Sequence, residues 1–378
     1  MGILIGADIV PTNLNREAFI KGDIGFLVGN QLTGILSNAD YRIFNLEVPL
    51  TDDLTPIQKC GPNLSAPCQT IEGFKKLGVD LFTIANNHIL DQGASGLFST
   101  INILDEAGIS YVGAGKNIEQ ARKPFYFQYA GKKIGVYACA EHEFSIATED
   151  TAGANPFDAL VSLDDIEETK EKVDYLIVLY HGGREGYRYP TPWQQKTCRK
   201  IVEKGADIVI CQHSHCIGSE EKYKNGRIVY GQGNFLFDHS KNEYWKTGLL
   251  IEINENFDVE YIPVIKQNEK VRIANTDDKE AILRDYKERS AQIATDGFVN
   301  DMYNDAVESR MDFYLANIMG ISSNSFIHKI LNKITGCKWR KTLVKIKLDD
   351  TYRVNLINCI ECEQHRELLL RALMMCKK

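Results

Sequence analysis

The alternation of apolar and polar runs predicts buried strands separated by helices over the first two-thirds of the chain. Short β-branched runs, each followed by polar residues, are typical of strands in a layered α/β protein. We expect such strands at 3–6, 43–46, 81–85, 176–180 and 208–211. Apolar segments flanking Gly131 predict a hairpin of 125–129 and 133–139, and three closing strands are expected at 228–231, 248–253 and 259–265.

Helix boundaries are marked by their capping residues. Gly78, Gly108 and Gly205 each follow a helical pattern and precede a strand, as a glycine just past a helix C-terminus does. Thr191, followed by Pro192 and Gln194, gives a capping residue, a first-turn proline and the third-position partner of a capping box. Only amphipathic helical patterns follow, at 277–293 and 299–318. We therefore expect an α/β domain at 1–268 and a helical C-terminal appendage at 269–378.

Composition narrows the class of protein. The 378 residues are 44% apolar and 25% charged, which is ordinary for a globular protein. A net charge of −7 argues against a generic nucleic-acid binder, and no nucleic-acid partner is expected. Ten cysteines are too dilute for a disulfide scaffold, and neither a signal peptide nor an apolar run long enough for a membrane span is evident. These features predict a cytoplasmic protein or one peripheral at the inner face of the membrane.

A basic stretch lies in the expected appendage. Between residues 325 and 347 the chain has no acidic residue, and aromatic and aliphatic residues are interleaved with seven basic ones: Lys329, Lys333, Lys338, Arg340, Lys341, Lys345 and Lys347. One interpretation is a basic amphipathic surface for membrane headgroups or an anionic polymer. The other is a solvated helix face, which is what charge runs more often form.

Polar side chains follow each of five expected strands. Each alone could cap a turn or hydrogen-bond a loop, but as a series they predict a metal site at the carboxyl edge of the sheets. The set consists of Asp8, Asn45, Glu47, Asn87, His88, His181, His213 and His215. Carboxylate, imidazole and amide ligands together favour a divalent transition metal, Mn, Fe or Zn, over Ca or Mg. A bridging carboxylate would allow one or two ions.

Individual roles follow from position. His213 and His215 are expected ligands because strand alternation would point both side chains the same way. His88 is a candidate general acid whose ring Asp91 could orient, although it could equally hydrogen-bond a neighbouring loop.

Other polar residues are expected around these ligands. Asn86 and Asn234 would organise loops near the site, and Glu185 could face substrate or form an exposed ion pair. We expect Asn45, Asn86, Glu185 and Asn234 on the substrate side. The segment 141–143 could add a further polar group.

Five blocks in series carry a resemblance to a known family. They are NLEVPL at 45–50, ANNH at 85–88 with Asp91 and Gly93, HGG at 181–183 with Glu185, HSH at 213–215 and GNFLF at 233–237. Together they resemble the capsule-synthesis CapA family of poly-γ-glutamate synthesis proteins, which is similar to calcineurin-like metallophosphoesterases. The resemblance covers about residues 2–265. It implies a four-layer sandwich of mixed β-sheets flanked by helices.

The resemblance also implies roles for residues of this chain. It makes Asp8, Asn87, His181, His213 and His215 metal ligands, puts Glu47 in the bridging position, and makes His88 the histidine that serves the leaving group. Where the metallophosphoesterases have a histidine two residues after the first aspartate, this chain has Val10. One metal position therefore lacks a ligand.

The implied function is capsule or extracellular polymer synthesis, through a metal-dependent phosphoesterase that hydrolyses a phosphate ester with a metal-bound hydroxide. The expected partners are a phosphorylated small molecule or polymer precursor and a capsule-synthesis membrane complex. The alternative is a non-catalytic accessory protein that binds polymer or a membrane synthase. Loss of the first-motif histidine favours this alternative, whereas retention of three histidines and two carboxylates favours an enzyme.

Overall fold

The computed structural model divides the chain into two compact units, Met1–Asn300 and Asp301–Lys378. It describes all residues except 1, 238–241, 322–329, 332, 336–337 and 377–378. Among the described residues, no helix is long and apolar enough to cross a membrane.

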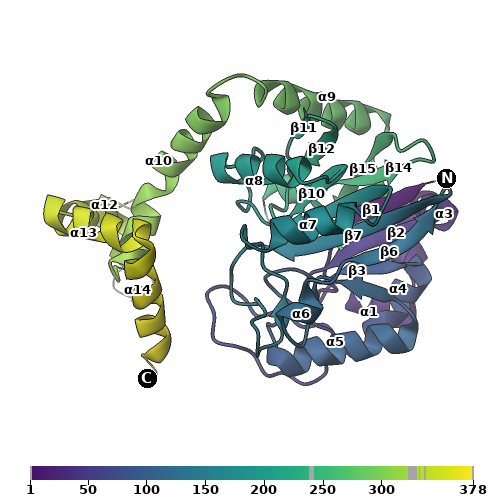
Figure 1. The fold of residues 1–378 in the computed structure, drawn as a ribbon, viewed down its shortest axis with the longest axis horizontal. Coiled ribbons are helices and arrows are strands. Elements are labelled where there is room, and N and C mark those ends of the chain that lie inside the picture. The colour runs from purple at the N-terminus through teal and green to yellow at the C-terminus, as the bar shows by residue number, and fades with distance from the viewer. Residues whose placement is uncertain (1, 238–241, 322–329, 332, 336–337, 377–378) are drawn as a thin grey trace. The chain divides into compact units, whose positions relative to one another are not determined.

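Two mixed sheets form the centre of the first unit (Figure 1). The eight-stranded sheet runs β16 (Lys270–Ile273), β15 (Val259–Gln267), β14 (Thr247–Ile253), β1 (Ile3–Ile9), β2 (Tyr41–Leu46), β3 (Leu81–Thr83), β4 (Ser110–Val112), with β13 (Asn234–Leu236) also paired to β1. The six-stranded sheet runs β11 (Glu220–Tyr223), β12 (Gly226–Val229), β10 (Ile208–Gln212), β9 (Tyr175–His181), β7 (Lys132–Ala140), β6 (Phe125–Tyr129). A small ribbon joins β5 (Ala114–Gly115) to β8 (Gly153–Ala154).

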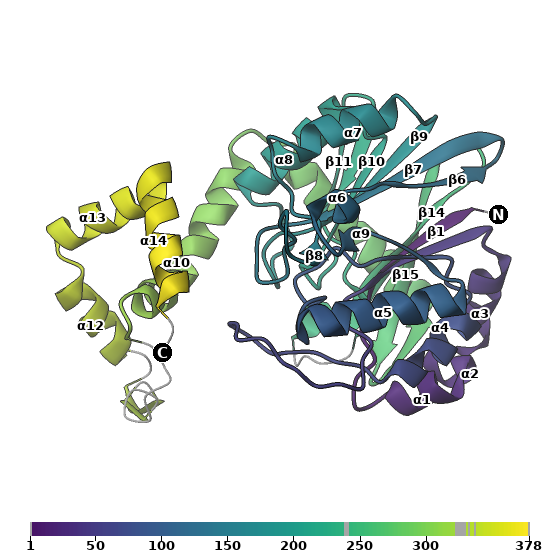
Figure 2. The ribbon, with the colours of Figure 1, turned by 60° about the horizontal axis from the view of Figure 1, so that its bottom comes forward.

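Helices cover the outer face of each sheet (Figure 2). The eight-stranded sheet packs against α1 (Arg16–Lys21), α2 (Ile24–Leu27), α3 (Gly29–Asn38), α4 (Ile71–Leu77) and α5 (Gly93–Ala107). The six-stranded sheet packs against α7 (Ser162–Lys170) and α8 (Pro192–Glu203). The remaining short elements are α6 (Ile118–Ala121), η1 (Cys68–Thr70) and η2 (Glu243–Lys246).

Three apolar clusters separate these layers. One lies between the sheets and joins Ile5 and Ile251 from the first to Ile177 and Ile210 from the second. The other two lie under the two helix layers. The layers follow the order helix, sheet, sheet, helix, which confirms the predicted four-layer α/β sandwich. In this order each sheet buries both of its faces.

The sheets are also joined near their carboxyl ends. The Nε2 of Gln212, at the end of β10, donates to the carbonyl of Gly6 on β1 at 3.2 Å. Gly6 needs to be glycine, because a Cβ there would lie 2.0 Å from the ring of Phe44. The strand ends of the two sheets are thus held at close range by a polar bond that crosses the apolar layer.

Parallel pairing brings the carboxyl ends of neighbouring strands to the same edge of each sheet, where the site was predicted. β1 pairs in parallel with β2, and β2 with β3, while β9 pairs in parallel with β7 and β10. All the predicted strands occur, as does the hairpin of β6 and β7. Gly78 and Gly108 end their helices in the left-handed conformation, and the hydroxyl of Thr191 accepts from the backbone of Gln194 as predicted.

The compact units divide at residue 300, whereas the predicted boundary lies near 268. The difference arises from α9 (Thr276–Gln292), which belongs to the first unit. Its residues Tyr286 and Arg289 are buried against the rest of that unit. An amphipathic pattern alone cannot tell a helix that belongs to a neighbouring domain from one that packs on the preceding sheet.

The second unit is helical, as expected of the appendage. It contains most of α10 (Phe298–Ile318), with α12 (Lys338–Lys347), α13 (Asp350–Glu361) and α14 (Glu363–Met375). Part of the basic stretch, including Lys329, lies outside the described residues. On α12 the basic side chains are partly or fully exposed and Val344 packs inward, so both interpretations of the stretch stay open.

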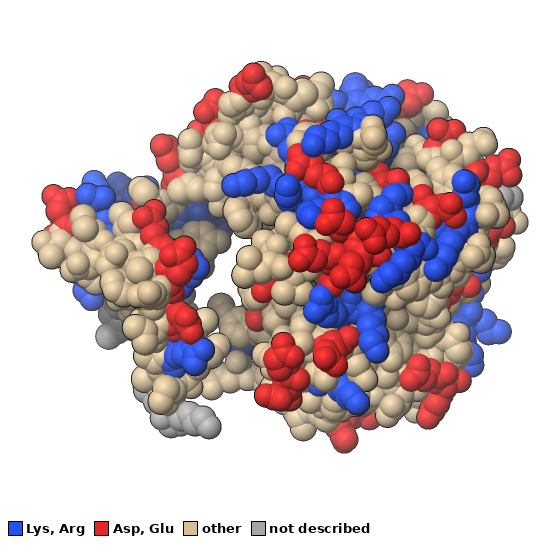
Figure 3. All heavy atoms as spheres, in the orientation of Figure 1, with Lys and Arg blue, Asp and Glu red and all other residues tan. Residues whose placement is uncertain are grey.

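The surface charge of the first unit is mixed. Over α7 and its neighbours, acidic and basic side chains are interleaved (Figure 3), and ion pairs join Arg122 to Asp165, Lys170 to Asp207 and Lys204 to Glu167. Exposed pairs of this kind contribute little stability. The face shown carries no uniform basic field of the type that nucleic acids need.

Candidate metal centre

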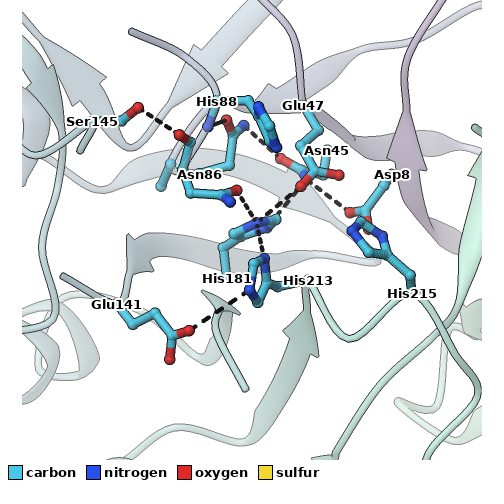
Figure 4. Close-up of polar contacts among 12 residues, drawn as sticks. Asp8, Asn45, Glu47, Asn86, His88, Glu141, Ser145, His181, His213 and His215 are labelled. Atoms are coloured by element: carbon cyan, nitrogen blue, oxygen red, sulfur yellow. Dashed lines mark hydrogen bonds and ion pairs between the residues drawn. The ribbon is translucent and has the colours of Figure 1, made fainter. Parts of the chain in front are cut away.

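The strand ends of both sheets deliver polar side chains into one buried cluster (Figure 4). Asp8 lies on β1 at an irregularity in its pairing, and Glu47 directly follows β2. His181 is the last residue of β9, and His213 and His215 follow β10. Asp8 and Glu47 are completely buried, so water cannot solvate their charges.

Three of these residues and Asn87 form a group that we call the inner set: Glu47, Asn87, His181 and His213. The Nε2 of His181 is central, because it lies 3.3 Å from Glu47 Oε1, 3.0 Å from Asn87 Oδ1 and 3.1 Å from His213 Nδ1. Ligand atoms of Glu47, His181 and His213 all lie within 4.8 Å of one another. One divalent ion could therefore be held by a carboxylate, an amide and two imidazoles.

An outer set shares Glu47 and adds Asp8 and His215. The Nδ1 of His215 lies 3.4 Å from Asp8 Oδ2, and ligand atoms of the three residues again lie within 4.8 Å of one another. Val10, at the position of the missing histidine, is buried in the apolar cluster on the helix side of the sheet and offers no ligand. The outer set thus has three donors and the inner set four.

The hydrogen bonding of the two carboxylates indicates whether a cation fits the cluster. Asp8 Oδ2 and both carboxylate oxygens of Glu47 are buried and accept no hydrogen bond from any described residue. Buried carboxylate oxygens normally have partners, and leaving them without one is costly. These oxygens face imidazole nitrogens across a few ångströms, which is the arrangement expected around a divalent cation. The donor set of nitrogen and oxygen atoms fits Mn, Fe or Zn.

The charges of the cluster depend on one another. Burial would raise the pKa of Glu47, but the imidazoles of His215 and His181 hold it below its ordinary range. Burial opposes protonation of His215, yet Glu47 and Asp8 raise the pKa of His215 to about 9. Burial, His181 and His215 together lower the pKa of His213. Burial also opposes protonation of His181, yet Glu47 and Asp8 raise its pKa. A metal would compete with protons for these imidazoles.

The two histidines of the HSH block have an unusual backbone. β10 ends at Gln212, and His213 and His215 have φ angles of 90° and 54°. The predicted reason for their convergence, alternation along a strand, is therefore wrong. Positive φ is costly for a residue with a Cβ and persists where surrounding contacts enforce it, often at functional sites. This backbone sends the two rings to different sets, with centroids 5.9 Å apart.

Three asparagines support the ligands. Asn45 Nδ2 donates to Asp8 Oδ1 at 2.8 Å, and Asn86 Nδ2 donates to Asn45 Oδ1 at 3.1 Å. Asn234 Oδ1 lies 2.9 Å from His215 Nδ1. Such bonds fix the orientation of ligands around a metal. The three amides are buried within the protein, and their predicted contact with substrate stays a prediction.

His88 is held by a buried ion pair that the sequence did not reveal. Its Nδ1 lies 2.6 Å from Asp91 Oδ2, as predicted for an orienting aspartate. The ammonium group of Lys59 bonds to the other oxygen of Asp91 and lies 3.2 Å from His88 Nδ1. The Lys59 side chain is 2% exposed and that of Asp91 0%. Lys59 comes from an irregular loop, where no periodic pattern marks a buried lysine.

Two further carboxylates lie beside His213. Glu141, at the end of β7, has its Oε1 3.7 Å from His213 Nε2, and burial raises the pKa of this carboxyl. It belongs to segment 141–143, where a further polar group was expected. Glu185 is exposed and brings a carboxylate oxygen within 4.8 Å of His213 and His215. Both lie where a ligand of the cluster would approach.

Comparisons with known proteins agree with the sequence blocks. The profile described as "Bacterial capsule synthesis protein PGA_cap" matches residues 15–239. The capsule biosynthesis protein CapA of Bacillus anthracis is 34% identical over 212 residues, covering 54% of this chain and 52% of that protein. The PGA biosynthesis protein CapA of Bacillus subtilis is 28% identical over 209 residues, covering 54% and 55%. The chain thus spans about half the length of these curated relatives.

Solved structures with remote similarity carry phosphatase names. A novel phosphatase from Mycoplasma pneumoniae aligns with 71% of this chain and 94% of its own, at 14% identity and a TM-score of 0.46. A 5'-nucleotidase precursor from Thermus thermophilus aligns with 78% of this chain and 59% of its own, at 14% identity and a TM-score of 0.41.

The match of the profile extends over more than half of the chain and contains every residue of the inner set. Asp8 of the outer set precedes it. On this evidence the chain belongs to the bacterial capsule synthesis family PGA_cap, in which CapA proteins are its curated relatives.

Proposed function

We propose that this protein is a metal-dependent phosphoric ester hydrolase that serves capsule or extracellular polymer synthesis. The observation that carries the proposal is the pair of buried carboxylates, Asp8 and Glu47. Asp8 Oδ2 and Glu47 Oε1 accept no hydrogen bond from the described residues and lie 3.4 Å from His215 Nδ1 and 3.3 Å from His181 Nε2, respectively. Apolar replacement of such a buried charged cluster is often neutral or stabilising, so the presence of this cluster favours a functional role over a purely structural one.

The inner set would hold one ion through four donors, and the outer set would hold a second ion more weakly through three. Glu47 belongs to both sets and would be able to serve both positions. A bound divalent ion would supply Lewis-acid polarisation of the phosphoryl oxygen and a nucleophilic water at neutral pH. Asn45 and Asn234 orient the carboxylate and imidazole of the outer set toward that ion.

His88 is the proposed general acid. Asp91 binds its Nδ1, which leaves Nε2 to carry the proton that the departing oxygen needs. Lys59 neutralises the second oxygen of Asp91 and ties the loop that carries it to the turn of His88. Glu141 and Glu185 lie beside His213, where they would disfavour additional negative charge and so help to select the substrate.

The substrate class and setting are inferred from the relatives. Their printed names, capsule biosynthesis protein CapA and PGA biosynthesis protein CapA, support a step on a phosphorylated small molecule or polymer precursor. A capsule-synthesis complex at the membrane is the proposed partner. A cytoplasmic location, or one at the inner face of the membrane, goes with this role.

A non-catalytic accessory role is the alternative. Val10 leaves the outer set with three donors. A relative from Mycobacterium tuberculosis, 24% identical over 213 residues, carries the name "Probable polyglutamine synthesis accessory protein". In this role the cluster would bind a ligand or stabilise the fold without turnover.

The deciding experiment measures metal content and hydrolysis on the same preparations. Native protein is purified without chelator and compared with the double variant His213→Ala, His215→Ala. Both are assayed on p-nitrophenyl phosphate and its diester with Mn, Zn or Fe added. We expect about one to two ions per chain and metal-dependent turnover in the native protein only.

Each outcome decides between the two roles. Metal without turnover across phosphoester substrates would favour the accessory role. A native protein that stays empty in the presence of all three metals would remove the hydrolase proposal.

A further inference from the structure

A pair of arginines lies on the loop that follows the HSH block. The Nε of Arg188 donates to the carbonyl of Ile217 at 3.0 Å, and the Nε of Arg289 donates to the carbonyl of Gly218 at 2.8 Å. Because these carbonyls are consecutive along the chain, both guanidinium groups are brought to the same short loop. Ile217 is only two residues beyond His215, so this loop also carries the outer-set histidine.

The bonds leave most donors of both guanidinium groups unused. A guanidinium has five N–H groups in a rigid fork, and each of these side chains uses only its Nε among the described residues. The Nη2 of Arg289 is buried and has no hydrogen-bond partner there. Anchoring each Nε fixes the plane of the group, which preorganises the remaining donors for an oxyanion.

The two positive charges lie close together without a carboxylate bonded to either in the described part of the chain. Burial and, after it, the charge of Arg188 together lower the pKa of Arg289 to about 10. Asp285, one turn earlier on α9, is paired with Arg284 at 3.4 Å. Two neighbouring guanidinium groups repel each other, and an anion between them would relieve this cost.

The pair is partly accessible to solvent through Arg188. Arg289 is 7% exposed, whereas Arg188 is partly exposed and its guanidinium carbon lies 4.9 Å from the ring centroid of Tyr244, which is 43% exposed. Arg188 thus links the buried donors of Arg289 to the surface. The loop of Arg188 also reaches the histidine block, because the backbone of Gly186 donates to the carbonyl of Ser214 at 2.8 Å.

We propose that Arg188 and Arg289 form an oxyanion subsite that binds a phosphate or carboxylate group of the substrate beside the metal centre. The assignment of the anion to the substrate rests on the proposed function, but the subsite itself does not. Two arginine forks suit a tetrahedral or planar oxyanion, and a second anionic group is what a phosphorylated or glutamate-containing precursor would present.

The test measures anion binding to chelator-treated protein, so that it is independent of metal and of turnover. Inorganic phosphate and the dipeptide γ-glutamylglutamate are titrated calorimetrically into native protein and into Arg188→Gln, Arg289→Gln and Arg289→Lys. Arg284→Gln is the matched control, because it removes an exposed arginine from the same helix. His213→Ala with His215→Ala separates binding at the metal cluster from binding at the arginine pair.

We expect each glutamine variant to weaken anion binding at least about tenfold, with partial recovery in Arg289→Lys and no change in the Arg284 control or the double histidine variant. Whichever of the two anions binds more tightly to native protein identifies the group that the subsite prefers. Folding of each variant is checked by thermal unfolding with and without the anion. If the arginines only supported the loop, their variants would have a lower Tm without anion, but the anion would still raise the Tm as it does in native protein. Equal affinity in native protein and both glutamine variants, or no anion binding by native protein, would overturn the proposal.

Discussion

The two units of this protein differ in what their elements bury. The first unit surrounds two sheets with three apolar clusters and encloses charged side chains in the middle of the fold. Among its described residues, the second unit has one small cluster, made by Ala316, Ile321 and Val344. Its helices α13 and α14 have no buried residue. Leu373, for example, is 63% exposed.

The contrast gives a physical reason to place the proposed chemistry in the first unit. Charged groups acquire unusual pKa values and fixed geometry only where packing removes water and holds them in place. Parallel strands from two sheets provide such an interior, and their carboxyl ends point into it. A helical unit with mostly exposed side chains leaves its charges in water. The following experiments change equivalent groups in the two units.

The largest contrast is expected between two glutamates. Glu47→Gln should weaken Mn binding by more than about 100-fold, because Glu47 contributes to both ligand sets. Glu361→Gln, on the exposed surface of α13, should leave Mn affinity unchanged. Calorimetric titration of each variant measures the difference. Retention of full affinity in Glu47→Gln would show that the cluster is not the metal site.

Apolar truncations should differ nearly as strongly. Ile251→Ala would leave a cavity between the sheets and lower the free energy of unfolding by about 2–5 kcal/mol. Leu373→Ala should change it by no more than about 0.5 kcal/mol. Denaturant unfolding monitored by circular dichroism gives both values. A comparable loss in Leu373→Ala would mean that a partner in solution buries α14.

The third contrast compares two lysine–aspartate pairs. Lys59→Met removes the partner of the fully buried Asp91 and should lower the free energy of unfolding by about 3 kcal/mol. Lys341→Met breaks the pair with Asp312, in which the lysine is 63% exposed, and should cost at most about 1 kcal/mol.

Lys59 has a second expected effect, on catalysis. Lys59→Met should lower kcat for phosphoester hydrolysis while metal content stays unchanged, because Asp91 would hold His88 less firmly. Lys59→Arg should recover part of kcat. Unaltered kcat in Lys59→Met would limit Lys59 to a role in stability.

The last expected effect is a pH dependence of metal-free protein. The pKa of His215 rises from 6.5 to about 9 on folding, so the folded protein holds this proton more tightly than the unfolded chain. This contribution is complete below pH 6.5 and is lost as the pH rises through about 9, with a slope of at most about 1.4 kcal/mol per pH unit.

The slope is measured by denaturant unfolding in chelator between pH 6 and 10. His215→Asn should flatten it, whereas His365→Ala, in the exposed α14, should leave it in place. An identical slope in His215→Asn would assign the effect to another group.

Much of the first unit was predictable because its signals are local. β-branched runs predicted the strands, and Gly78, Gly108 and Thr191 marked helix ends, since each acts through contacts within a few residues. Position at strand ends also predicted that Asp8, Glu47, His181 and the HSH block would meet. The division of the units at residue 300 was not predicted, because the packing of α9 is a contact between distant segments.

The sequence by itself determined the order of the elements and the family, because periodicity and motif spacing are properties of neighbouring residues. Only the tertiary structure decided how the polar residues are used. It gave His213 and His215 positive φ angles and paired Lys59 with Asp91. It also brought the side chains of Arg188 and Arg289 to the same loop. These arrangements depend on segments far apart in the chain, and the free energy of packing two sheets together, rather than any local propensity, enforces them.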